Sequence, residues 1–262
     1  MNLNLINKTA LVCGASQGLG AAVAKELAAL GANIIALARN EDKLKAAIAA
    51  LPVTSGQQHS YIAADTNIPA NVKEKVSAYL KKGNTIHILV NNTGGPPSHP
   101  LINTPADELE AAFRSHLITS HTLVQLLVDG MKQVGYGRIV NIVSTSVKQP
   151  INGLGISNTV RAAVANWAKT LANELGSFGI TVNNVLPGST KTDRLDYLFG
   201  KQAESVNTTV DEIVKRSIAQ IPAGRLGEPE EFGAAVAFLC SPAASYINGI
   251  NLPVDGGKLG GL

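Results

Sequence analysis

The sequence of 262 residues is poor in cysteine, in aromatic residues and in charge, and each shortage excludes a class of protein. Its two cysteines, Cys13 and Cys240, are too few for a disulfide framework, so a reducing, cytoplasmic setting is expected. Charged residues make up only 16% and aromatic residues 4%, with no basic stripe carrying interleaved aromatics. We therefore predict no nucleic-acid binding. No apolar run approaches membrane length and no N-terminal signal stretch is recognised, so we expect no membrane association; we also predict no metal site.

What the chain does contain is a regular alternation of segments typical of strands and helices. The segments that resemble strands are Thr9–Cys13, Asn33–Ala38, Ile86–Val90, Arg138–Val143, Ile180–Val185 and Ile250–Val254, and those that resemble helices lie near Glu41–Ala50, Asn71–Lys82, Asp107–Met131, Ile156–Leu175 and Pro229–Cys240. This order predicts a doubly wound α/β fold, with a parallel sheet of about seven strands and helices on both faces. Residues 1–262 are expected to form a single Rossmann-type domain. The one long irregular insertion, residues 189–224, is predicted to be a lid.

A glycine-rich loop follows the first strand and precedes a helix. The loop reads Gly14-Ala15-Ser16-Gln17-Gly18-Leu19-Gly20, and apolar residues at helical spacing follow it as far as Leu30. Free N–H groups and the helix dipole attract phosphate at such a position, and glycine lets the backbone approach a pyrophosphate closely. We predict a dinucleotide site here; the alternative is an ordinary glycine-rich turn.

The end of the second strand bears on which dinucleotide binds. An acidic residue at this place recognises the ribose 2′-hydroxyl of NAD, whereas arginine suits the 2′-phosphate of NADP. The strand ends in Leu37-Ala38-Arg39-Asn40, with no acid before Glu41, and a guanidinium can fork onto phosphate oxygens. Arg39 therefore favours NADP (NADPH) over NAD, the alternative being a solvated residue at the start of the next helix.

From Lys8 to about Gly257 the chain resembles the short-chain dehydrogenase/reductase family, and most closely its 3-oxoacyl-acyl-carrier-protein reductase-like members. The matching pieces are the glycine loop, Asp65, Asn91-Asn92-Thr93-Gly94, Gly137-Arg138-Ile139-Val140-Asn141-Ile142, Pro187-Gly188, the stretch from Gly224 to Phe232, and Asp255-Gly256-Gly257. The resemblance implies a nicotinamide cofactor, one Rossmann domain and a homotetramer. The helices 107–131 and 156–175 would bury apolar faces between subunits, although such stripes are more often core.

The resemblance also assigns cofactor contacts. Asp65 corresponds to the family's adenine contact, with a helix N-cap as an equal alternative. Gln17 stands where NADP-dependent members often have a second basic residue. The other assigned residues are Asn92 and Gly94 at a strand end, Pro187 and Gly188 beside the nicotinamide, and Thr190 or Thr192 on its carboxamide or the phosphates.

The catalytic positions are where the chain departs from the family. Members use a serine, a tyrosine, a lysine four residues after it, and an asparagine on the preceding helix. Ser144 is retained, but Ser157 replaces the tyrosine and Arg161 the lysine, while His116 occupies the asparagine position. His116 could serve as a replacement acid, or it could be a hydrogen-bonded helix histidine. The pair Tyr197 and Lys201 in the insertion has the right spacing and is interpreted as a chance match.

Two functions follow from these residues. The first is an NADP(H)-dependent oxidoreductase that reduces a carbonyl, of the 3-oxoacyl type or in a small ketone, with an atypical catalytic tetrad of Ser144, Ser157, Arg161 and His116. The alternative is a catalytically inactive, nucleotide-binding member that acts as a sensor or scaffold. Acidic and basic residues nearly balance within residues 190–221, so the sequence shows no basic landing site for an acidic carrier protein.

Overall fold

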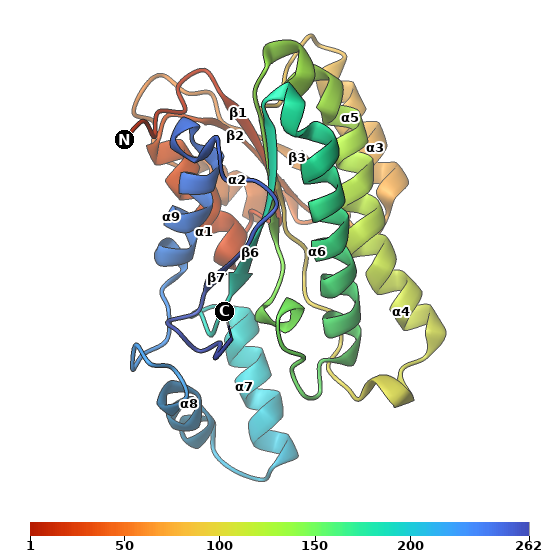
Figure 1. Ribbon diagram of the computed structural model, residues 1–262, viewed down its shortest axis with the longest axis vertical. Coiled ribbons are helices and arrows are strands. Elements are labelled where there is room, and N and C mark those ends of the chain that lie inside the picture. The colour runs from red at the N-terminus through yellow and green to blue at the C-terminus, as the bar shows by residue number, and fades with distance from the viewer. Residues whose placement is uncertain (262) are drawn as a thin grey trace.

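The computed structural model describes residues 1–261 and places a parallel sheet between two layers of helices (Figure 1). The seven strands are β1 (Thr9–Cys13), β2 (Asn33–Ala38), β3 (Ser60–Ala63), β4 (Ile88–Asn91), β5 (Gly137–Ile142), β6 (Ile180–Pro187) and β7 (Asn251–Val254). Their order is β3-β2-β1-β4-β5-β6-β7, and all neighbours run parallel. This confirms the doubly wound Rossmann fold. The sequence segments had not identified β3 as a strand.

The strands β1 to β6 supply apolar side chains to both helical layers, because successive residues of a strand point to opposite faces. In β1, Ala10 and Val12 face one core, whereas Leu11 and Cys13 face the other. The first core lies beneath α1 (Gly18–Ala29), α2 (Glu41–Ala49) and α9 (Pro229–Cys240), and the second beneath α3 (Pro69–Leu80), α5 (Thr119–Val134) and α6 (Gly155–Leu175). Figure 1 shows α1 and α9 on one side of the sheet and α3, α5 and α6 on the other.

The predicted helix 107–131 is present, but it is not a uniform α-helix. The chain forms α4 (Ala106–Phe113), then a π-helical segment at Arg114–Ile118, and only then α5. The π segment shifts the hydrogen-bond pattern, and the Thr119 hydroxyl compensates, 3.2 Å from the carbonyl oxygen of Arg114 and 2.7 Å from that of Thr66. Hydrophobic periodicity cannot report this change, since one extra residue in a turn hardly alters the apolar stripe. Such π segments are frequent at functional sites.

The irregular insertion predicted at residues 189–224 is also corrected by the structure. It contains α7 (Asp193–Ser205) and α8 (Val210–Ala219), which extend beyond one end of the sheet in Figure 1. Threonine side chains cap both helices: Thr192 accepts from the N–H of Leu195, and Thr209 accepts from that of Glu212. A small apolar cluster around Phe199, Ala203 and Ile213 holds them together. Within residues 1–261, no helix combines the length and apolar character needed to cross a membrane.

Candidate active site

A large cleft lies at the carboxyl ends of the strands, where open α/β sheets bind ligands. Its volume of about 1190 Å³ exceeds the range of about 300–1,000 Å³ typical of small-ligand pockets. The residues that follow β1, β2, β4, β5 and β6 all contribute to its lining. The sheet order reverses between β1 and β4, so the cleft occupies the topological switch point.

The glycine loop forms one wall of this cleft. Gly14 has φ +62°, in the left-handed region, and a Cβ there would lie 2.5 Å from Nδ2 of Asn92. Gly20 does not line the cleft, but a Cβ on it would lie 2.2 Å from the carbonyl oxygen of Gly14. Both positions therefore require glycine for close backbone packing. The loop residues that line the cleft are Gly14, Ser16, Gln17, Gly18 and Leu19.

We call the part of the cleft lined by Arg39 and Lys43 the adenosine end. Arg39 follows β2, while Lys43 lies on α2, whose N-cap is Asn40. Lys43 Nζ donates to Oε1 of Gln17 at 2.9 Å. Lys43 is thus a second basic residue at this end of the cleft, beside Arg39 and in contact with the glycine loop. Its spacing of four residues from Arg39 was the available signal, which the sequence analysis missed.

Asp65 lies beside the adenosine end without lining it, although Ala64, Thr66 and Asn67 do line it. Its carboxylate accepts from the backbone N–H of Asn67 at 3.0 Å and from the side-chain amide of Asn67 at 2.9 Å. The N-cap of α3 is Ile68, so the alternative interpretation of Asp65 as a helix N-cap is wrong. The adenine contact stays a prediction.

The opposite wall gathers the remaining predicted cofactor residues. Gly188 is packed against the chain terminus, since a Cβ there would lie 2.6 Å from Cα of Asp255. Thr192 lies across from the glycine loop, its Cγ2 being 3.7 Å from where a Cβ of Gly18 would be. Gly94, Pro187, Gly188, Thr190 and Thr192 all line the cleft, and Asn92 lines it from directly beside Gly14.

We call the part lined by Ser144, Ser157 and Arg161 the catalytic end. Ser144 follows β5 and its Oγ accepts from the N–H of Ser146 at 3.1 Å, which leaves the hydroxyl proton free to donate. Ser157 and Arg161 stand one turn apart on α6 and both line the cleft. Nη1 of Arg161 donates to the carbonyl oxygen of Ile142 at 2.6 Å. Three of the four residues predicted for catalysis are therefore brought together.

His116 lies behind this end rather than in it. The side chain is buried, and its Nδ1 is hydrogen-bonded to the hydroxyl of Thr93, which does line the cleft. Burial, followed by the charge of Arg161, holds the pKa of His116 well below its usual value of 6.5. The imidazole is therefore uncharged at neutral pH. It can exchange a proton through Thr93 but cannot act as a standing imidazolium acid.

The Tyr197 and Lys201 pair is not assembled as a catalytic site. Tyr197 does not line the cleft and is 52% exposed, and its ring faces the guanidinium of Arg194 at 5.4 Å. Lys201 Nζ instead forms an ion pair with Glu204 at 2.8 Å. The structure thus leaves no tyrosine among the described residues that line the cleft.

A ladder of asparagines links four strands, and its members are buried except Asn251, which is partly exposed. Asn91 donates to Asn141 at 2.8 Å, Asn141 to Asn184 at 2.9 Å, and Asn184 to Asn251 at 2.8 Å. These residues are register partners on β4, β5, β6 and β7. The ladder fixes the register of β4, β5, β6 and β7 relative to one another. Its sequence signal, an asparagine at a matching place in successive strands, was not recognised.

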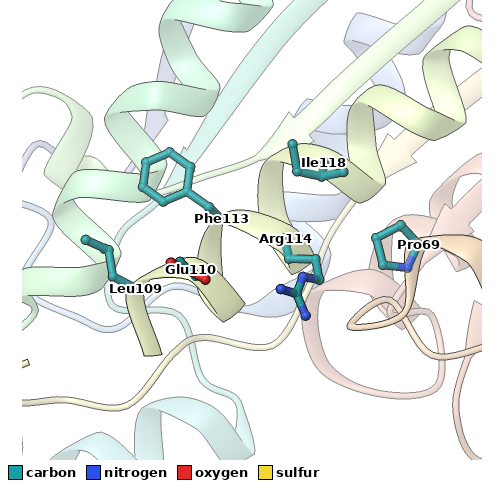
Figure 2. A pocket seen from close by; sticks show the side chains of 6 residues that line it. All are labelled: Pro69, Leu109, Glu110, Phe113, Arg114 and Ile118. Atoms are coloured by element: carbon teal, nitrogen blue, oxygen red, sulfur yellow. The ribbon is translucent and has the colours of Figure 1, made fainter. Parts of the chain in front are cut away.

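A second pocket lies outside the cleft, on the surface formed by α4, the π segment and the start of α3 (Figure 2). It is lined by Pro69, Leu109, Glu110, Phe113, Arg114 and Ile118. The stripe predicted to be buried between subunits is partly used within the chain, since Leu109 and Phe113 pack against Ile156 and Val160. Ile118 is 49% exposed.

The cleft residues fit a nicotinamide dinucleotide. The loop at Gly14 and Gly20 has no room for a Cβ, which is the cradle that a pyrophosphate needs. The cations Arg39 and Lys43 line the adenosine end, and the N-terminus of α1 opens at the loop. When bound, such a cofactor supplies or accepts a hydride.

Comparison with known proteins identifies the family of this chain. The family model of enoyl-(acyl carrier protein) reductase matches residues 14–258. The chain is 35% identical to the 3-oxoacyl-(acyl-carrier-protein) reductase of Vibrio cholerae, over 97% of this chain and 98% of that protein. The crystal structure of L-sorbose reductase from Gluconobacter frateurii with NADPH and L-sorbose superimposes with a TM-score of 0.93, at 29% identity and with full coverage of both chains. The actinorhodin polyketide ketoreductase with NADPH gives 0.89 at 27% identity, covering 96% of this chain and 97% of the other. The chain belongs to the short-chain dehydrogenase/reductase family of oxidoreductases.

Proposed function

We propose that this protein is an NADPH-dependent reductase of a carbonyl group whose catalytic set contains no tyrosine. The observation that carries the proposal is that Ser144, Ser157 and Arg161 line the same cleft as the glycine loop and Arg39. The relatives named above are reductases, and two of the solved structures hold NADPH. The class of substrate is a 3-oxoacyl compound or a small ketone.

The roles of the residues follow from their chemistry. The Ser144 hydroxyl donates to the substrate oxygen, because the N–H of Ser146 holds its oxygen in place and leaves its proton free to donate. Arg161 stabilises negative charge that develops on that oxygen and binds a ribose hydroxyl. Ser157 is too weak an acid, and its side chain too short, to replace a tyrosine directly. The proton comes from water, in exchange with the Thr93 hydroxyl and with His116 behind it.

The preference for NADPH over NADH is part of the same proposal. A 2′-phosphate adds about two negative charges, and Arg39 and Lys43 are the two cations that line the adenosine end. A ribose hydroxyl would instead call for an acceptor there. The only carboxylate among the described residues of the cleft lining is Asp193, whose Oδ2 is 3.4 Å from the amide nitrogen of Gln17.

One observation favours the second candidate, a nucleotide-binding protein without catalysis. No described side chain of the cleft lining is an acid of the strength that a lysine-assisted tyrosine provides. The retained Ser144 and the buried cation at position 161 favour catalysis instead, because a binding protein needs neither.

Three further features complete the proposal. The insertion at residues 189–224 acts as a lid, since Thr192 and Arg194 on it line the cleft. We expect hydrogen exchange in the insertion to be faster than in the strands and to slow when NADPH binds.

The assembly is a homotetramer that uses the outer surfaces of α4, α5 and α6, and sedimentation would detect it. The cytoplasmic setting rests on the scarcity of cysteine alone.

The test is an NADPH fluorescence titration followed by a screen of carbonyl substrates. The proposal predicts micromolar or tighter binding of NADPH, weaker binding of NADH, and turnover of at least one carbonyl compound. Binding without turnover across a broad screen would establish the non-catalytic function instead. Absence of NADPH binding would refute both.

A further inference from the structure

Two arginines meet at the catalytic end of the cleft without a carboxylate partner. Arg161 projects from α6 and Arg194 from α7, and both line the cleft. Nε of the buried Arg161 has no hydrogen-bond partner among the described residues. Nη2 of Arg194 donates to the carbonyl oxygen of Pro96 at 3.0 Å, so its guanidinium spans from the insertion to the loop after β4. Neither arginine forms an ion pair within residues 1–261.

The loop after β4 is shaped around Arg194. A Cβ on Gly95 would lie 2.8 Å from Nη2 of Arg194 and 3.1 Å from its Cζ. The glycine therefore gives the guanidinium a place directly against the backbone. This contact fixes where the charge lies in the cleft, near enough to Arg161 to lower the pKa of that group.

The charges of the cleft are unevenly matched. Its described lining has four cations, Arg39, Lys43, Arg161 and Arg194, against the single carboxylate of Asp193. Under the proposed function, the phosphates of NADPH neutralise the two cations of the adenosine end. The nicotinamide carries no negative group, and it becomes positive when oxidised. The two arginines of the catalytic end are left for another anion.

We infer that the substrate is an oxo acid whose carboxylate is bound by Arg194, with Arg161 facing the reacting carbonyl; this inference rests on the proposed function. A guanidinium binds a carboxylate through two parallel N–H···O bonds, which also fixes its orientation. Leu154, Leu195 and Leu198 also line the cleft, and Leu195 and Leu198 lie on α7 with Arg194, so the remainder of the substrate is apolar.

The mutual influence of the two arginines agrees with this assignment. Burial, followed by the charge of Arg194, lowers the pKa of Arg161 from 12.5 to about 10. Two cations that repel each other across a partly enclosed site are stabilised by an anion between them. In the reaction the carbonyl carbon gains a hydride from NADPH and its oxygen gains a proton from water. NADPH becomes NADP⁺, and the carboxylate is unchanged.

The test compares 2-oxo and 3-oxo acids with their methyl esters, which keep the carbonyl and remove the charge. In the wild type, kcat/KM should be at least 10-fold higher for an acid than for its ester. Arg194→Met should lower that ratio by about 10- to 100-fold, the loss expected for a charge-assisted hydrogen bond. Arg194→Lys should restore part of it. Arg216→Met, on an exposed residue of α8 outside the cleft, is the matched control and should not change the ratio.

A binding measurement separates this inference from the proposed function. Calorimetric titration of the NADPH-loaded protein with oxamate, and with neutral oxamide, reports the anion site without turnover. If the wild type binds oxamate and Arg194→Met does not, the inference is supported, even when no carbonyl compound is reduced. The lack of reduction would then refute only the proposed reductase activity. The inference is overturned if the wild type has nearly the same kcat/KM for the acid and the ester, or if the ratio of the two is the same in Arg194→Met. Turnover of a carbonyl compound would still support the reductase activity. Should NADPH not bind, the reductase fails, and oxamate added to the free protein decides the anion site by the same dependence on Arg194.

Discussion

Arg161→Met should make the protein more stable and much less active. Burial, followed by the charge of Arg194, lowers the pKa of Arg161 from 12.5 to about 10. At about 1.4 kcal/mol per pH unit, keeping this guanidinium charged costs the folded state about 3 kcal/mol. Because the folded state lowers the pKa of this base, the loss of stability is fully present below about pH 10, where both states are protonated. It disappears above pH 12.5, where both states are neutral. Methionine removes the charge while it keeps most of the volume.

Part of this gain in folding stability is offset by a lost hydrogen bond. The carbonyl oxygen of Ile142 loses the 2.6 Å hydrogen bond from Arg161, which costs about 1–1.5 kcal/mol. We therefore expect the free energy of unfolding to rise by about 1–2 kcal/mol in Arg161→Met. Catalysis should fall by about 100-fold or more, because a preorganised donor at the reacting oxygen is lost. Gains in stability at the expense of activity are typical of functional sites.

The assays are urea denaturation without cofactor, NADPH titration, and kcat/KM on the best carbonyl substrate. Arg138→Met is the control. Arg138 is equally buried but lies outside the cleft, and it donates to the carbonyl oxygens of Gly137, Gly179 and Ser241 at 2.8, 3.1 and 3.3 Å. Its loss should destabilise the fold and leave the chemistry intact. If Arg161→Met lowers stability by more than 2 kcal/mol, or keeps full activity, the reasoning about a charge held for function is refuted.

Three other predictions follow from the described contacts. Lys43→Met should weaken NADPH binding about 10-fold and NADH binding less than twofold, and Arg39→Asp should reverse the preference, since charge-assisted bonds to a 2′-phosphate are removed; equal losses for both cofactors in fluorescence titration would contradict this. Asn141→Val should lower the free energy of unfolding by about 2–4 kcal/mol in urea denaturation, because both neighbours in the asparagine ladder lose a partner; a loss below 1 kcal/mol would contradict it. The depressed pKa of His116 means that the unfolded state binds more protons below pH 6.5, so stability should fall as the pH is lowered from 6.5. His116→Asn should flatten that dependence, and an unchanged slope would show that another group is responsible.

The strand pattern predicted most of the fold because buried parallel strands are short apolar runs separated by helices. Only β3 was missed, since its four residues include Ser60 and Tyr61 and are only partly buried. The π segment around His116 was not predictable, because it depends on side-chain contacts such as that of Thr119 with Thr66. The helices of the insertion were missed because their few apolar residues pack mainly on each other.

The candidate site was predictable where a residue acts through its place at a strand end. Ser144, Asn92 and Arg39 all follow strands, and all line the cleft. Lys43 and Arg194 were missed as cleft residues because they project from helices, and only the packing of α2 and α7 brings them there. His116 was assigned to the right helix, but its burial and its bond to Thr93 are tertiary properties.

The most direct test of the central claim is a single-turnover measurement with NADPH deuterated at the transferred position and the best carbonyl substrate. The account predicts an alcohol that carries one deuterium on the former carbonyl carbon. Ser144→Ala should slow its formation by about 100- to 1,000-fold, whereas Ser157→Ala should slow it by less than about 10-fold, because water rather than this hydroxyl delivers the proton. If Ser157→Ala abolishes the reaction while Ser144→Ala spares it, or if the wild type binds NADPH and forms no deuterated alcohol, the account is contradicted.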